Sequence, residues 1–527
     1  MNNTVYKHLK NIFPCLVFSA LTGIIAAIVV TAFKIAAEFV VHLSSSIYGG
    51  IRANPIWLPI LVISAAMIGF LASLIWSVSS SCRGGGIPTS VAAIRGIVSF
   101  NWLRCLIVLP ISSLLTFLCG LPLGTEGPCV QMGTAVGDGV VQCLGNKKHA
   151  GWRRYIMTGG ASAGFSIATS SPVAAIMFSM EELHKHFSPL LLTVASISIT
   201  SAQITMYALS ACGIGTIGLF QLPTIPPMPP RLLFVPLFIG ILSGIGAILL
   251  THLYHIIDKF IHSILKRVSC KILLPVLFVC VSTVGFFLAD TLYSGHALVI
   301  SIFQTETVWY MLILILLIRA ICMTVSNTAG ATGGVFLPTL AFGAIIGALC
   351  AKALIALGWI EPQHYILMVI LGIASFLGAT SRIPLTACVF AIESMNGIRN
   401  VLPIIIATTV AFITAEISGL EDFTDTVINA RIHKIANGKI PLVVETPLTV
   451  KAHSFAIGKE IRDVLWPNSC VVISFEHSKN NNGISCIGEG DIITVRYSTY
   501  NPTATIKELE DLVGAQSDEI RDLAKSG

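Results

Sequence analysis

The sequence contains little charge. Only 11% of its 527 residues are Asp, Glu, Lys or Arg, whereas soluble domains average about 25%, and the mean hydropathy is +0.83. No soluble protein of this length needs so much apolar surface. The composition therefore excludes a soluble globular protein and predicts a polytopic membrane protein.

The sequence also lacks common enzyme and metal motifs. It contains no His-Glu-x-x-His and no phosphate-binding Gly-Lys-Ser/Thr, which disfavours the alternative of a membrane-embedded enzyme that uses paired acids. Its 14 cysteines include no Cys-x-x-Cys pair. Most of them lie in apolar runs, where free cysteine behaves as a small hydrophobe. We expect no metal ion and no cofactor.

Several apolar runs are long enough, or nearly so, to cross a bilayer, which takes about 20 residues. Gly and Pro interrupt some runs, so the sequence predicts roughly ten to fourteen crossing or re-entrant helices. The runs are Ile12–Val41, Ile56–Trp76, Leu103–Leu121, Leu190–Leu209, Leu232–Leu250, Ile272–Ala289, Val308–Val325 and Leu402–Ala415.

Basic residues indicate the orientation. The mildly basic N-terminus precedes an apolar run that is too long for a signal-peptide core. The loop Asn146–Arg154 is the densest basic stretch and should lie in the cytoplasm. We expect both termini in the cytoplasm, and a prokaryotic plasma membrane because the architecture is simple. The net charge of +6 then belongs to cytoplasmic loops, and no nucleic-acid partner is expected.

Composition changes after Lys439, where charged residues become frequent and long apolar runs end. We predict a transmembrane domain over residues 1–438 and a small cytosolic α+β domain over residues 439–527. The predicted elements of the second domain are strands at Cys470–Phe475 and Asp491–Tyr497, a turn at Lys479–Gly483, and a helix at Thr505–Val513.

Two blocks of the transmembrane part recur. Pro128–Gly137 resembles Pro338–Gly347, and Pro172–Glu181 resembles Pro384–Glu393, in the same order and at nearly equal spacing. The match predicts duplicated halves. Short, Gly- and Pro-broken segments at matching positions of two halves are typical of a transporter whose binding site lies between them.

Three Gly- and Pro-rich segments interrupt the apolar pattern, each before a helical stretch: Gly84–Pro88, Gly124–Pro128 and Gly333–Pro338. A helix N-terminus offers free N–H donors and about half a positive charge, which suits an anion. We expect the three helix ends to converge on a small anion. The alternative is that they are plain turns between spans.

Glu126 lies within the second of these segments. An ionised side chain at bilayer depth costs at least ~2.5–3.5 kcal/mol, and a broken helix at that depth is either buried in protein or lines a cavity. Glu126 therefore predicts an ion or proton site.

These motifs, their order and the repeat resemble the CLC family of chloride channels and proton-coupled chloride transporters, from Val5 to Gly438. The resemblance implies an all-α polytopic membrane fold with two inverted repeats and broken, re-entrant helices. It implies a homodimer in the lipid bilayer, with one anion pathway per subunit and Glu126 as external gating glutamate. The implied anion-binding residues are Gly85, Gly86, Ile87, Glu126, Gly127, Val335, Phe336 and Thr424.

A second acidic feature is Glu181-Glu182. The resemblance implies that Glu182 is the internal proton acceptor, a residue that channel members generally lack. The alternative is that the two acids cap a helix at the membrane interface. We expect structural roles for the neighbouring or repeat-related residues Glu181, His184, His186 and Glu393.

Two positions depart from the family pattern. Gly85 stands where family members usually carry Ser or Pro, and Glu421–Arg431 contains no Tyr, with Thr424 or Asp425 near the expected place. Without the Ser hydroxyl at position 85 and the Tyr hydroxyl in Glu421–Arg431, the inner gate of the anion pathway should be weaker. The resemblance therefore leaves two functions: a chloride/proton antiporter or, as the alternative, a passive chloride channel.

The C-terminal domain resembles the C-terminal subdomain of potassium-conductance regulators, through Phe455–Arg462 and Ile487–Val495. Such a module implies dimerisation or the binding of a ligand that the sequence does not identify.

Overall fold

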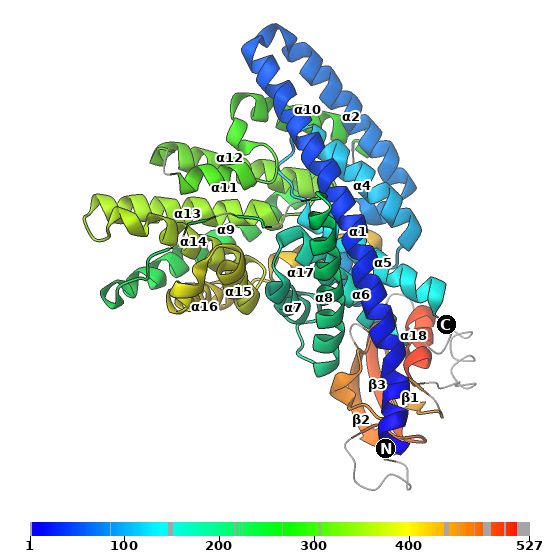
Figure 1. The fold of residues 1–527 in the computed structure, drawn as a ribbon. Coiled ribbons are helices and arrows are strands. Elements are labelled where there is room, and N and C mark those ends of the chain that lie inside the picture. The colour runs from blue at the N-terminus through cyan, green and yellow to red at the C-terminus, as the bar shows by residue number, and fades with distance from the viewer. Residues whose placement is uncertain are drawn as a thin grey trace.

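The computed structural model describes residues 3–84, 86–145, 151–215, 218–220, 222–223, 225–265, 267–304, 307–436, 442–452, 454–467, 470–477, 486–499 and 502–513. Within these residues a large helical part is followed by a small sheet and one more helix (Figure 1).

The helices of the first part and their bounds follow the order of the chain. They are α1 (Asn3–Ala53), α2 (Leu58–Val78), α3 (Ile87–Ile94), α4 (Trp102–Leu118), α5 (Glu126–Leu144), α6 (Arg153–Thr169), α7 (Pro172–Phe178), the π-helix η4 (Ser179–His184), α8 (Pro189–Ala211), α9 (Phe234–Leu265), α10 (Cys270–Phe287), α11 (His296–Phe303), α12 (Trp309–Ala329), α13 (Phe336–Ala356), α14 (Tyr365–Thr380), α15 (Pro384–Ser394), α16 (Val401–Ile417) and α17 (Phe423–Ala436).

Most of these helices are long and apolar. Nine helices in the described ranges are long and apolar enough to cross a membrane, and the shorter α4 and α15 are also apolar. With these two shorter helices, the number of apolar helices in the described ranges falls within the predicted range. The prediction of a helical, multi-pass membrane fold is confirmed.

Helices α5 and α6 are less apolar but almost completely buried, because glycines let their backbones touch. A Cβ on Gly133 would lie 2.1 Å from the carbonyl oxygen of Gly160. The segment Gly160–Gly164 also matches Gly-x-Ser-x-Gly, but it lies inside α6 and the Ser162 hydroxyl donates to the Thr158 carbonyl at 2.8 Å. This serine belongs to helix packing and not to a nucleophile turn.

The second half repeats this arrangement with α13 and α14, where a Cβ on Gly343 would lie 2.6 Å from the Gly372 carbonyl oxygen. The matching turns also share backbone conformation. Ser170 and Arg382, each two residues before the proline that opens α7 or α15, have φ values of 55° and 59°. Duplicated halves, as predicted from the repeat, are therefore visible in the fold.

The two halves cap each other's helices. The Glu393 carboxylate accepts from the backbone N–H groups of Val173 and Ala174 at 3.1 and 3.0 Å, at the start of α7. Glu181 accepts in the same way from Leu385 and Thr386, at the start of α15. These contacts satisfy donors that a helix start leaves unpaired. The structural roles expected of Glu181 and Glu393 are confirmed.

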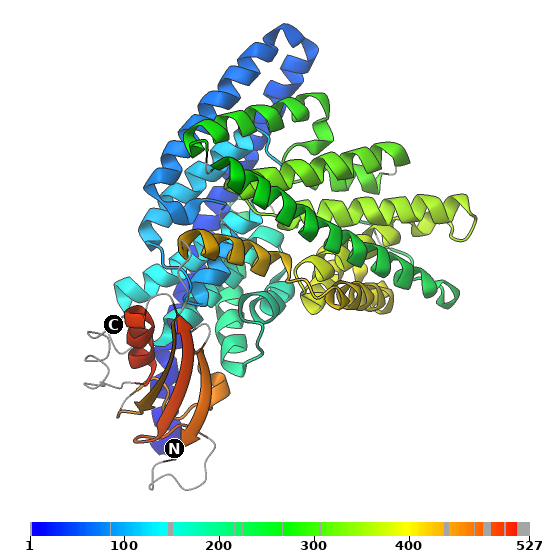
Figure 2. The same cartoon turned by 180° about the vertical axis from the view of Figure 1, so that it is seen from behind.

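The C-terminal module contains strands β1 (Leu442–Thr449), β2 (Cys470–Glu476) and β3 (Ile492–Thr499), and helix α18 (Pro502–Val513). The sheet order is β1-β3-β2 with both pairs antiparallel (Figure 2). The predicted β2, β3 and α18 are confirmed within three residues, and β1 was not predicted. The predicted turn Lys479–Gly483 lies outside the described residues.

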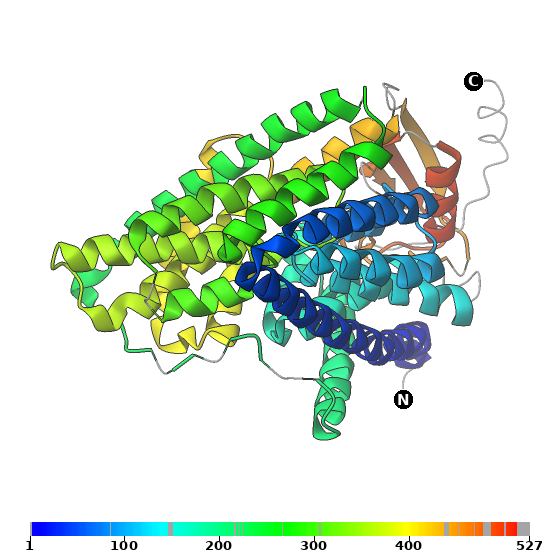
Figure 3. The same ribbon diagram turned by 90° about the horizontal axis from the view of Figure 1, so that it is seen from above.

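This module lies beside the first half of the membrane part (Figure 3), and its contacts with Trp152 and Tyr155 place it at the N-terminal end of α6. The Phe455 ring contacts Trp152 with ring centroids 4.9 Å apart, and the Tyr155 hydroxyl donates to the Asp463 carbonyl. The Lys459 ammonium lies 3.5 Å from the Phe455 ring centroid, and burial lowers the pKa of Lys459 to about 8. Aromatic packing and backbone hydrogen bonds therefore attach the module to α6.

The cap formed by Glu393 can be tested through stability. Glu393→Ala leaves the buried N–H of Ala174 without its acceptor, so we expect a loss of about 1–2 kcal/mol, measured as a lower midpoint of thermal unfolding in detergent. The control is Glu361→Ala, because this glutamate is 59% exposed and pairs with Arg231 only at 3.7 Å. Equal midpoints for the two variants would contradict the capping role.

Candidate functional site

Three helix starts meet at one point in the membrane part. A Cβ built on Gly86, the residue before α3, would lie 2.8 Å from the Cα of Gly127 in the first turn of α5. A Cβ on Gly127 would in turn lie 2.6 Å from the Cα of Gly334, just before α13. These distances require glycine. The predicted convergence of the three broken segments is therefore confirmed.

The N-cap residues of α5 and α13 do not cap their helices, and the Glu126 carboxylate lies near the backbone N–H groups of Glu126 and Leu337 at these two helix starts. In the described structure neither Thr125 nor Val335, the N-cap residues of α5 and α13, forms a side-chain cap hydrogen bond. Phe336 is the first residue of α13. Free donors and aligned helix dipoles suit a small anion. Gly85, the predicted anion-binding residue that lacks a hydroxyl, lies outside the described residues.

Glu126 opens α5 and is 1% exposed. Its Oε1 accepts from the Thr125 hydroxyl at 3.1 Å, while its buried Oε2 has no hydrogen-bond partner in the described part of the chain. A buried carboxylate oxygen without a donor is costly when the group is ionised. The geometry therefore suits a carboxyl group that changes its protonation state or moves.

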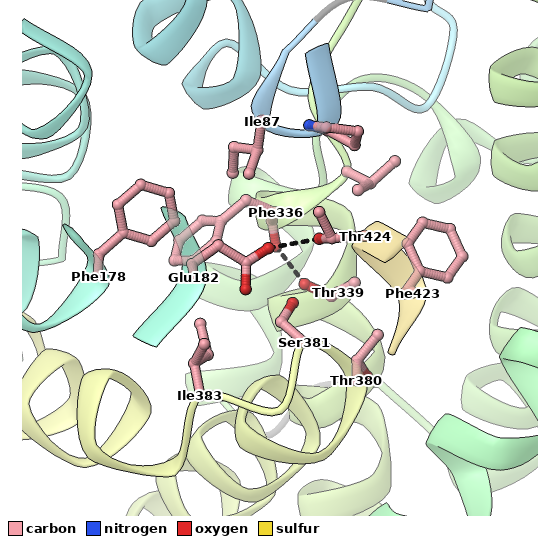
Figure 4. A pocket seen from close by; sticks show the side chains of 12 residues that line it. Ile87, Phe178, Glu182, Phe336, Thr339, Thr380, Ser381, Ile383, Phe423 and Thr424 are labelled. Atoms are coloured by element: carbon pink, nitrogen blue, oxygen red, sulfur yellow. Dashed lines mark hydrogen bonds between the residues drawn. The ribbon is translucent and has the colours of Figure 1, made fainter. Parts of the chain in front are cut away.

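A pocket lies on the side of the helix starts that faces η4 and α17 (Figure 4). It brings together five of the predicted residues: Ile87, Glu182, Val335, Phe336 and Thr424. Glu126, Gly86 and Gly127 do not line it. The other lining residues, which sequence reasoning missed, are Pro88, Phe178, Thr339, Thr380, Ser381, Ile383 and Phe423.

Glu182 projects from η4 into this pocket and is 2% exposed. The Thr424 hydroxyl donates to Glu182 Oε1, and the buried Oε2 has no hydrogen-bond partner among the residues described. Glu182 therefore faces the pocket and does not cap a helix, whereas its neighbour Glu181 does. The predicted Thr424 lies at the pocket and Asp425 points into an ion-pair network.

That network lies next to Glu182. Arg95 donates to the Glu182 carbonyl at 3.1 Å and to Asp425 Oδ1 at 2.9 Å. Lys185 donates to Asp425 Oδ2 at 2.6 Å and pairs with Asp422. Burial is the largest influence on the pKa of Asp422 and raises it. Arg95 and Lys185 are thus paired with Asp422 and Asp425, and this ion-pair network joins α3 and the end of η4 to α17.

The expected structural histidines take part in packing contacts. His184 Nε2 and the Thr158 hydroxyl lie 2.7 Å apart, which joins η4 to α6. His186 Nε2 lies 2.9 Å from the Arg462 carbonyl in the C-terminal module. Within the ranges that the structure describes, no group of three His, Cys, Asp or Glu could hold a metal ion.

The family model for voltage gated chloride channels matches residues 67–416. The chain belongs to this family. Family members are channels and transporters, and the match covers the helix starts, both buried glutamates and most of the pocket.

Curated relatives include the H(+)/Cl(-) exchange transporter ClcA of Vibrio vulnificus, which is 29% identical over 433 residues and covers 79% of this chain and 90% of the relative. ClcA of Vibrio cholerae is 29% identical over 438 residues and covers 78% of this chain and 88% of the relative. Similar folds include a slow cyanobacterial Cl-/H+ antiporter, with a TM-score of 0.72 and 22% identity over 80% of this chain and 98% of that chain. A CLC-type fluoride/proton antiporter is similar with a TM-score of 0.64 and 19% identity, over 76% of this chain and 95% of that chain. These solved structures establish the family fold.

The resemblance of the C-terminal module to potassium-conductance regulators stays a prediction, although a small α+β region is present.

The contact between helix starts can be tested with Gly127→Ala. The new methyl group would lie against the backbone of Gly334 and Gly86 and separate the helix ends, so we expect chloride binding and flux to fall to background. Gly49→Ala is the matched control, because no atom lies within 4 Å of a Cβ at that position. Unchanged chloride flux in folded Gly127→Ala protein, measured in proteoliposomes, would contradict a site at this junction.

Proposed function

We propose that the protein is a chloride/proton antiporter of the CLC type, with Glu126 as external gate and Glu182 as internal proton acceptor. One observation carries the proposal. Two fully buried carboxyl groups, each with an oxygen that lacks a partner in the described structure, flank the junction of the three helix starts. The names of the ClcA relatives support the same transport chemistry.

Glu126 acts as a substitute for the transported anion. Its carboxylate belongs to the first residue of α5, where free N–H groups favour negative charge. Protonation removes that charge and weakens the attraction to the helix start. An anion can then occupy the vacated place, so proton binding and anion movement are linked.

Glu182 exchanges protons at the other end of the pathway. It lies in η4, next to the loop that contacts the C-terminal module through His186 and Arg462. The Thr424 hydroxyl stabilises the ionised carboxylate at Oε1, while Oε2 remains able to accept a proton. We place this end, with both chain termini, on the cytoplasmic side.

The remaining assignments belong to the same proposal. The protein forms a homodimer in a prokaryotic plasma membrane, with residues 1–438 as transport domain and residues 439–527 as a regulatory or dimerisation domain that has an unidentified ligand. The central anion binds to Gly85, Gly86, Ile87, Gly127, Val335 and Phe336, and Thr424 lines the inner pocket next to this site.

Glu126→Gln tests the external gate. The amide cannot ionise, so we expect uphill proton movement driven by a chloride gradient to disappear while chloride flux persists. A pH indicator and a chloride electrode measure both fluxes in proteoliposomes, and the exposed Glu38→Gln serves as control. Proton pumping retained by Glu126→Gln would exclude this gate, and a wild-type protein that moves no protons uphill would be a passive channel.

Glu182→Gln tests the internal acceptor. The glutamine carbonyl still accepts from Thr424, so the pocket geometry is kept and only the ionisable group is lost. We expect proton transport to stop. The neighbouring Glu181→Gln should keep it, because one amide oxygen still accepts from the start of α15. Normal proton coupling in Glu182→Gln would leave this glutamate a structural role.

A further inference from the structure

The inner pocket needs a hydroxyl donor other than the residues assigned so far. Gly85 has no side-chain donor, and the Thr424 hydroxyl is already bonded to Glu182. An anion below Phe336 would therefore meet backbone donors on one side and apolar side chains such as Ile383 and Phe178 on the other. A partly desolvated anion binds well only where donors replace its water.

Two other hydroxyls in the pocket wall are occupied. Thr339 donates to the Phe336 carbonyl at 2.6 Å, and Thr380 donates to the Phe376 carbonyl at 2.7 Å. Both bonds run back along the helix that carries the threonine. These hydroxyls are therefore not available to a ligand.

Ser381 differs from its neighbours. It lines the pocket, and its oxygen points into the pocket in Figure 4. Its backbone N–H donates to the Leu377 carbonyl at 3.2 Å, but its hydroxyl has no hydrogen-bond partner in the described part of the chain. The adjacent Glu182 Oε2 also lacks a partner and lines the same pocket. Two polar atoms without partners in the described structure thus line the same pocket.

The backbone holds Ser381 in this position. Helix α14 ends at Thr380, Ser381 is its C-cap, and Arg382 follows with φ 59°. The Arg382 guanidinium donates to the Ala415 carbonyl at 2.6 Å, at the end of α16. In the first half the equivalent residue, Thr169, donates to the Phe165 carbonyl at 2.8 Å. The side-chain hydroxyl at this repeated position is therefore free to bind a ligand in the second half, at Ser381, but not in the first, at Thr169.

We propose that Ser381 donates its hydroxyl to the anion in the inner pocket and sets the preference for chloride, which takes the place of the missing donors at Gly85 and Glu421–Arg431. The identity of the anion rests on the proposed function. A single directed O–H donor favours a small anion of concentrated charge, such as chloride, over nitrate, whose charge is spread over three oxygens.

The test is chloride and nitrate binding to the purified full-length protein, measured by calorimetry in detergent. Ser381→Ala should weaken chloride binding about fivefold, the effect of one lost hydrogen bond, and should affect nitrate less. Ser381→Thr should restore chloride binding. Thr283→Val is the control, because this threonine does not line the pocket and its hydroxyl donates to the Val279 carbonyl at 2.8 Å; it should bind chloride as the wild type does.

Unchanged chloride affinity in folded Ser381→Ala protein would overturn the inference, and so would an equal loss of affinity in Thr283→Val. If the alanine variant does not fold, Ser381→Cys supplies a side chain of similar size with a weaker donor, and its chloride affinity should lie below that of wild type. An affinity equal to wild type would again overturn the role of Ser381.

The two proposals fail in different ways. If the wild-type protein moves chloride without protons but loses chloride affinity on Ser381→Ala, the antiport proposal fails and the role of Ser381 stands. If coupled transport occurs and Ser381→Ala binds chloride normally, only the role of Ser381 fails. A wild-type protein that binds no chloride would overturn both.

Discussion

Two hydrogen bonds between Gly124 and Gly334 hold the centre of this protein together. Each backbone N–H donates to the other residue's carbonyl oxygen at 2.7 Å, forming an isolated antiparallel bridge between the two halves. A Cβ on Gly334 would lie 2.5 Å from the backbone nitrogen of Gly127, so only glycine permits this approach. Helices α5 and α13 begin two residues after these glycines. The bridge therefore fixes the distance between two helix starts, and with it the place where an anion meets free N–H donors.

The two halves are also joined beside the inner pocket, where Glu181 and Glu393 each cap a helix of the other half. Glu181 caps a helix of the other half, whereas the next residue, Glu182, faces the pocket. Both lie in a π-helix, a wider turn that often occurs at functional sites. Because the Glu181 carboxylate is fixed on Thr386, the direction of the following side chain is fixed as well. Two adjacent acids thus have separate roles, one in joining the halves and one in the pocket.

The sequence predicts the features that depend on local pattern. Apolar runs mark the spans, and Gly and Pro mark the helix starts where the anion site was expected. Contacts between distant segments were not predictable: Arg95 and Asp425 are 330 positions apart, and no local signal pairs them. The turn at Ser381 was missed although it precedes a repeated proline. Strand β1 was missed because Glu445 and Pro447 interrupt its apolar pattern.

The C-terminal module and the inner pocket are mechanically connected through α6. Tyr155 and Trp152 at the start of α6 contact the module, and Thr158, one turn further on, contacts His184 at the end of η4. Since packed helices move as rigid bodies and not as flexible chains, a displacement of the module would be transmitted to the segment that carries Glu182. The cap that Glu181 forms with the second half and the contact of α6 with the module therefore both help to position the inner carboxyl group, beside the direct contacts of Glu182 with Thr424 and Arg95.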